Sequence, residues 1–161
     1  MNILDFALEK EQMSLDFYNQ LAQKTSGKGL HNIFVLLVAE EQKHYDAIKN
    51  LKEKVPAGLA QTDILNNAIM TFGDIRDSID NFDFDISELD LYKKAVEVEG
   101  KALNFYLEKV DQVEGQSQKD IFRVLAMEEK KHYTLIDNIV DFVSRPKDWL
   151  ENAEFTHLEE Y

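Results

Sequence analysis

The sequence predicts an all-α protein, a four-helix bundle built from two repeated helical hairpins joined by a long crossover. Three observations predict this fold. Only 2 of the 161 residues are proline and 6 are glycine, and helix-forming Leu, Ala, Glu, Lys and Gln are abundant. Apolar residues recur at alternating steps of three and four, which is the spacing of one helix face. The two halves of the chain also match in register, as internal repeats do.

The first hairpin is predicted from two apolar stripes separated by a glycine-containing turn. We expect the first helix over about residues 3–24 and the second over about 30–54, with a tight connection at 26–29. Residues 55–87 are expected to form the crossover and to include a short helix at 62–72. A connection of this length can travel along the bundle and start the third helix parallel to the second.

The second hairpin repeats the first. The third helix is expected to begin at a capping box that starts at Ser87 and to be closed by Gly115, and the fourth helix is expected over about residues 118–144. Residues 1–146 would then form one bundle domain. The remaining tail, 147–161, is too short and polar for a fifth full helix and is expected to pack on the bundle or on a second subunit.

Composition narrows the classes of function. The formal net charge of −13 at pH 7 disfavours nucleic acid, whose binding needs a lysine and arginine footprint. The absence of cysteine excludes disulfides, zinc fingers, iron–sulfur clusters and a rubredoxin-type iron site within these residues. No apolar run approaches the roughly 20 residues of a membrane span, and the first residues are acidic where a signal peptide is basic. We therefore expect a cytoplasmic protein that binds neither nucleic acid nor membrane.

The most informative motif is Glu-x-x-His, which occurs as Glu41 with His44 and again as Glu129 with His132. Residues three apart share one face of a helix, so each pair can hold the same metal ion. Both pairs interrupt an apolar stripe and are therefore expected to face the core. Because a buried charge without a partner is costly, these side chains need something that neutralises them.

Two further glutamates, Glu11 and Glu99, lie on the inward stripes of the first and third helices. Glu9 and Glu97 stand two residues earlier, a rotation of roughly 200° around the helix axis, and are expected at the surface. The repeat maps Glu11 onto Glu99, so both hairpins should place their ligands at one level of the core.

Four carboxylates at one level carry a charge of −4, which two divalent metal ions neutralise. The six predicted ligands are Glu11, Glu41, His44, Glu99, Glu129 and His132. The alternative is a set of glutamate–histidine pairs satisfied by hydrogen bonds alone, which repulsion among four carboxylates disfavours. An oxygen-rich set of six ligands fits iron or manganese better than tetrahedral zinc.

The chain resembles the rubrerythrin branch of the ferritin-like superfamily over about residues 3–143. The resemblance is carried by Glu11 with Tyr18, Glu41-x-x-His44, Glu99, and Glu129-x-x-His132. It implies a ferritin-like bundle with two bound iron ions and reduction of hydrogen peroxide, or of O₂. Without a rubredoxin site of its own, the chain would need an external electron-donor protein.

The sequence departs from the family pattern at a further carboxylate, which rubrerythrins carry one turn after the glutamate of the third helix. That position is Ala102 here, mirrored by Ser14 in the first half. Two other functions therefore stay open, a ferroxidase or iron-handling protein and a structural bundle held together by its metals. An exposed Trp149 and Phe155 in the tail would be unusual, and we expect them to support a homodimer.

Two tyrosines, Tyr18 and Tyr106, lie two turns after Glu11 and Glu99 on the same stripes. They are candidates for hydrogen bonding to the ligands or for quenching stray oxidants, and they would then count among the catalytic residues. The alternative is that both are core aromatics whose hydroxyl groups are simply satisfied.

Overall fold

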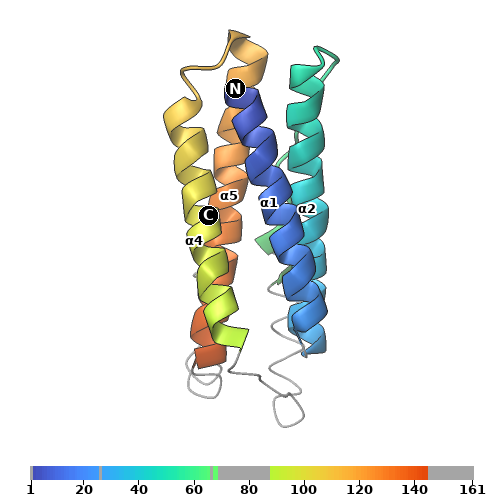
Figure 1. The fold of residues 1–161 in the computed structure, drawn as a ribbon, viewed down its shortest axis with the longest axis vertical. Coiled ribbons are helices and arrows are strands. Elements are labelled where there is room, and N and C mark those ends of the chain that lie inside the picture. The colour runs from blue at the N-terminus through green and yellow to red at the C-terminus, as the bar shows by residue number, and fades with distance from the viewer. Residues whose placement is uncertain (1, 26, 66, 69–87, 145–161) are drawn as a thin grey trace.

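The structure is a computed structural model that describes residues 2–25, 27–65, 67–68 and 88–144. Within these residues, long helices run side by side as an elongated bundle (Figure 1). In chain order the helices are α1 (Ile3–Lys24), α2 (Lys28–Lys52), α4 (Leu89–Lys109) and α5 (Gly115–Ser144). The described residues contain no strand, and the predicted all-α class is confirmed.

The helices pair as two hairpins, since α1 packs along α2 and α4 packs along α5. The helices of each hairpin are antiparallel, while α2 and α4 run in the same direction (Figure 1). This arrangement is the one expected when a long crossover joins the second helix to the third. None of the described helices combines the length and the apolar character needed to cross a bilayer.

The described part of the crossover begins after α2 and runs back along the bundle (Figure 1). Thr62 reaches α5 and hydrogen-bonds to Glu128. Ile64, Leu65 and Ala68 are buried in one of the apolar clusters. The chain is helical at 64–65 and 67–68, within the predicted short helix. Residues 62–63 of that helix are described and are not helical. Residues 66 and 69–72, the remainder of the crossover and the predicted tail contacts fall outside the described residues.

Several helix ends differ from the sequence prediction. α2 begins at Lys28 and ends at Lys52, two residues early at each end. The N-cap of α4 is Glu88, whose side chain makes no capping hydrogen bond, and Ser87, where the predicted capping box starts, lies outside the described residues. Gly115 does not close α4 but opens α5 with a φ of +74°. A positive φ is readily adopted by glycine, which explains this residue type at the corner of the second hairpin.

Two apolar clusters fill the bundle towards its two ends. Leu37 of α2 belongs to one cluster and Ile48 to the other. Glu41 and His44 lie between these two residues in the sequence of α2, and both side chains are fully buried. The core of the bundle therefore contains a polar layer with an apolar cluster on each side of it.

Candidate metal centre

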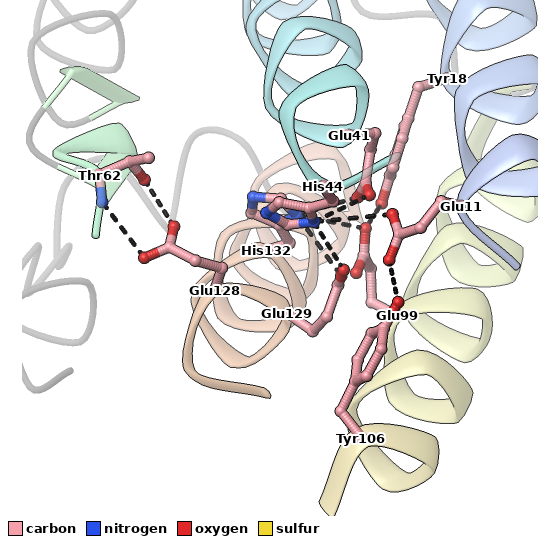
Figure 2. Close-up of polar contacts among 10 residues, drawn as sticks. All are labelled: Glu11, Tyr18, Glu41, His44, Thr62, Glu99, Tyr106, Glu128, Glu129 and His132. Atoms are coloured by element: carbon pink, nitrogen blue, oxygen red, sulfur yellow. Dashed lines mark hydrogen bonds and ion pairs between the residues drawn. The ribbon is translucent and has the colours of Figure 1, made fainter. Parts of the chain in front are cut away.

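Every long helix contributes to the polar layer. α1 and α4 supply one glutamate each, and α2 and α5 each supply a glutamate and the histidine three residues later (Figure 2). All six side chains are at most 1 % exposed. These six are the residues predicted from the sequence, Glu11, Glu41, His44, Glu99, Glu129 and His132. The structure thus brings all of the candidate ligands together.

The six residues divide into two overlapping groups. In each group, one candidate ligand atom per residue lies within 4.8 Å of all the others. The first group consists of Glu11, Glu41, His44 and Glu129, and the second of Glu41, Glu99, Glu129 and His132. Glu41 and Glu129 belong to both groups, so their carboxylates are placed to bridge two ions.

The histidines contact the opposite hairpin in a reciprocal way. The Nδ1 atom of His44 lies 2.9 Å from Oε1 of Glu129, and the Nδ1 atom of His132 lies 3.0 Å from Oε1 of Glu41. The two imidazole rings are nearly parallel, with centroids 5.3 Å apart and an interplanar angle of 8°. Both Nδ1 edges therefore face the carboxylates, and these atoms are the candidate nitrogen ligands.

Tyr18 and Tyr106 also make reciprocal contacts between the two hairpins. The hydroxyl of Tyr18 on α1 donates a hydrogen bond to Glu99 on α4, and the hydroxyl of Tyr106 on α4 donates one to Glu11 on α1 (Figure 2). Both tyrosines are fully buried. Each hydroxyl thus holds the carboxylate that belongs to only one of the two groups. Whether either tyrosine takes part in catalysis stays a prediction.

The protonation of the metal-free centre follows from burial and from these contacts. Burial and the charges of Glu41 and Glu129 raise the pKa of Glu11 and of Glu99. Burial opposes ionisation of Glu41 too, but hydrogen bonds to the two histidines outweigh it and bring the pKa of Glu41 well below its usual value. The same balance, with a further hydrogen bond to Glu99, lowers the pKa of Glu129 to about 2.

Burial lowers the pKa of the two histidines, but hydrogen bonds to the glutamates dominate and raise it well above the usual value. These shifts favour protonated histidines beside ionised Glu41 and Glu129. In the metal-free protein, protons on the histidines therefore offset part of the negative charge of the carboxylates.

The donor set fits metal ions. One atom on each of the six residues is buried without a hydrogen-bond partner, namely Oε2 of the four glutamates and Nε2 of the two histidines. Native proteins rarely leave buried polar atoms unpaired, and a bound ion would satisfy the four glutamate oxygens. Four carboxylates with two imidazoles form an oxygen-rich set that suits iron or manganese, whereas a tetrahedral zinc site takes four ligands.

The sequence prediction missed a buried carboxylate that lies close to the histidine ligands. Glu128 is 0 % exposed and forms a third group with His44 and His132, again with candidate ligand atoms within 4.8 Å of one another. Its position directly before Glu129 in the repeated motif could have drawn attention to it. Its contact with Thr62 could not have been foreseen, because no local pattern relates the crossover to α5.

A four-helix bundle whose core holds one glutamate from each of two helices and Glu-x-x-His from each of the other two defines the ferritin-like class, in which such sites bind two metal ions. The sequence model of the rubrerythrin family matches residues 2–140, and the chain belongs to this family. A hypothetical protein from Pyrococcus furiosus has a similar structure, with a TM-score of 0.65, 21% identity and 89% of each chain covered. At this identity the likeness shows the fold alone. A search of curated proteins found no match.

Proposed function

We propose that the chain binds two iron ions at its six buried ligands and reduces hydrogen peroxide there, with a separate redox protein as electron donor. The observation that carries the proposal is the pair of overlapping four-residue groups that share Glu41 and Glu129. The unpaired buried oxygen on each of the four glutamates and the membership of the rubrerythrin family support it. A cytoplasmic location and a homodimer, with Trp149 and Phe155 at its contacts, are part of the same proposal.

When bound, two ferrous ions supply the two electrons that, with two protons, convert one hydrogen peroxide to two waters. The protein provides the setting for this reaction. Its six ligands offer at most eight carboxylate oxygens and two imidazole nitrogens, whereas two octahedral ions take about twelve donors. At least one position stays free for the oxidant. The burial of all six side chains keeps bulk water from the remaining positions.

A second candidate function is oxidation and transfer of ferrous iron. Ala102, only 5 % exposed, lies one turn after Glu99 on α4, where rubrerythrins carry a further carboxylate. Without that ligand, an oxidised centre would hold its metal ions less firmly. This observation favours iron handling over a peroxidase.

Rapid mixing separates the candidates. Anaerobic, reduced, iron-loaded protein is mixed with hydrogen peroxide or with O₂, and near-ultraviolet absorbance is followed while released iron is collected by ultrafiltration. We expect oxidation by peroxide within seconds, slower oxidation by O₂, and retained iron. Preference for O₂ with rapid release of iron would favour the iron-handling function. A reduced protein inert to both oxidants would leave only a structural role for the metals.

A further inference from the structure

The two repeated motifs have the same chemistry but different surroundings. In the first half Glu40 precedes the ligand Glu41, and in the second half Glu128 precedes the ligand Glu129. Each of these preceding glutamates forms an ion pair with the lysine three residues later, with 2.9 Å between Oε1 and Nζ. The side chain of Glu40 is nevertheless 12 % exposed, whereas that of Glu128 is fully buried. Something outside the repeat therefore covers Glu128.

The covering segment is the crossover. The backbone N–H of Thr62 donates to Oε1 of Glu128 at 3.2 Å, and its hydroxyl donates to Oε2 at 2.6 Å. The ammonium group of Lys131 bonds both Oε1 of Glu128, at 2.9 Å, and the carbonyl of Thr62, at 3.3 Å. On the α2 side, by contrast, the crossover leaves a cavity of about 630 Å³ that Glu40 lines.

Glu128 lies on the Nε2 side of the two imidazole rings. The four glutamate ligands lie on the other side, where the Nδ1 atoms are. One carboxylate oxygen of Glu128 and one nitrogen of each of His44 and His132 lie within 4.8 Å of one another. The Nδ1 atoms face Glu129 and Glu41, and the Nε2 atoms are buried without partners. Figure 2 shows Glu128 and the four other glutamates on opposite sides of the two rings.

Metal binding makes an acceptor at this edge necessary. When Nδ1 of a neutral histidine binds a metal ion, Nε2 carries the proton and becomes a donor. A buried donor without an acceptor bears the full cost of its lost hydration. A carboxylate offers about four acceptor sites, of which Thr62 and Lys131 occupy three on Glu128. One site, on Oε2, remains free.

We propose that Glu128 is a positioning residue for the metal centre, accepting the Nε2–H of one histidine ligand through its remaining site. The contact is direct or passes through one water, which a separation of this size accommodates. Thr62 holds the carboxylate in place, so the crossover supports this histidine. This inference rests on the proposed dimetal site. Partners of this kind fix the orientation and tautomer of metal-ligating histidines.

The test measures affinity for Zn²⁺, a diamagnetic probe, by competition with a chromogenic chelator. Removing such a partner typically weakens metal affinity by about 10–100-fold, and we expect a loss of this size in Glu128→Gln. Thr62→Val removes only the hydroxyl anchor and should weaken affinity less. Glu40→Gln is the matched control, since it removes the same charge at the repeat-related position, and its affinity should stay within about twofold of the wild type.

A second readout detects the hydrogen bond itself. In ¹⁵N-labelled, Zn²⁺-loaded protein, imidazole N–H protons that donate to a carboxylate are shifted downfield and exchange slowly. We expect such signals in the wild type and in Glu40→Gln, and upfield, fast-exchanging ones in Glu128→Gln. Circular dichroism of the metal-free variants checks that they are folded. If Glu128→Gln does not fold, a loss of affinity with upfield signals in Thr62→Val still supports the proposal, and unchanged affinity and signals there overturn it.

The possible failures are distinguishable. Wild-type protein that binds two Zn²⁺ ions, with Glu128→Gln and Glu40→Gln indistinguishable in affinity and in imidazole signals, overturns this inference and leaves the proposed function standing. Wild-type protein that binds no metal overturns the dimetal site, and the inference falls with it.

Discussion

At the scale of single residues, the period of the α-helix decides which glutamates reach the core. Glu9 and Glu97 are exposed, whereas Glu11 and Glu99 are 1 % and 0 % exposed. The members of each pair stand two residues apart, and a rotation of roughly 200° between them accounts for the difference. This distinction was available from the sequence, because apolar neighbours mark the inward face of each helix. A chemically identical side chain two positions away therefore provides a control for Glu11 and for Glu99.

Alanine substitution of the four buried glutamates should lower bound metal well below two ions per chain. Each variant removes one carboxylate from a group of four candidate ligands, and loss of a bridging residue affects both groups. The substitutions are Glu11→Ala, Glu41→Ala, Glu99→Ala and Glu129→Ala, with Glu9→Ala and Glu97→Ala as controls. Metal is counted by elemental analysis of anaerobically purified protein. A normal content of two ions in Glu99→Ala would contradict the assignment of the site.

The hydroxyl groups of Tyr18 and Tyr106 should stabilise the metal-free protein to a similar extent. Each donates to a buried carboxylate of the other hairpin, and loss of a buried partner costs about 1–3 kcal/mol. We expect Tyr18→Phe and Tyr106→Phe to lower the free energy of unfolding by that amount in urea titrations with a chelator present. Tyr133→Phe is the control, since Tyr133 is 37 % exposed. Losses no larger than that of the control would show that the two hydrogen bonds contribute nothing.

At the scale of secondary structure, the helices follow from the sequence, but the crossover does not. Apolar periodicity placed α1 at the observed bounds, and the repeat related α1 and α2 to α4 and α5. Thr62 belongs to no periodic pattern, and its partner Glu128 looks equivalent to Glu40 in the sequence. The crossover itself breaks this equivalence, because Thr62 hydrogen-bonds to Glu128 of α5, whereas Glu40 of α2 lines a cavity beside the crossover. A contact of this kind depends on the tertiary structure, which local propensity cannot reveal.

The stability of the protein should depend on glycine at position 115, in the turn between α4 and α5. At Gly115 a Cβ atom would meet nothing within 4 Å, but its φ of +74° is strained for any residue with a side chain. Gly115→Ala should therefore lower the free energy of unfolding by about 1–2 kcal/mol. Gly58 offers equal space without a positive φ, so Gly58→Ala should be neutral or stabilising by about 0.4–1 kcal/mol. Chemical denaturation of both variants measures the difference, and equal effects would argue against strain at the corner.

At the scale of the whole molecule, metal binding and folding are linked because the ligands come from all four long helices. An ion that binds only the folded chain stabilises it by about 4 kcal/mol at a thousand times its dissociation constant. For a chain of this size, that corresponds to roughly 10 °C in melting temperature. The bundle should thus be tied together by its metals as well as by its two apolar clusters.

Removal of metal should accordingly lower the melting temperature by roughly 10 °C, and re-addition of Fe²⁺ under anaerobic conditions should restore it. Scanning calorimetry of chelator-treated and reloaded protein measures the shift. Glu99→Ala serves as the control, because a variant that loses a ligand from one of the two groups should show a smaller shift with metal than the wild type. A wild-type melting temperature that does not respond to metal would separate folding from the proposed site.

The choice of oxidant should depend on position 102. Ala102 is buried on α4 one turn after Glu99, so a glutamate there would extend from the same face of the helix. Ala102→Glu restores the carboxylate that rubrerythrins carry. This carboxylate would leave fewer coordination positions free for the oxidant. We expect the ratio of the oxidation rates by hydrogen peroxide and by O₂ to rise about tenfold, equivalent to 1.36 kcal/mol of barrier.

Ala102→Gln, equal in size to Ala102→Glu but uncharged, separates the effect of the carboxylate from that of crowding. Both variants must first be shown to hold two irons, and stopped-flow mixing of the reduced proteins with each oxidant then gives the rates. The same ratio in Ala102→Glu and Ala102→Gln would mean that the carboxylate does not set the preference for peroxide.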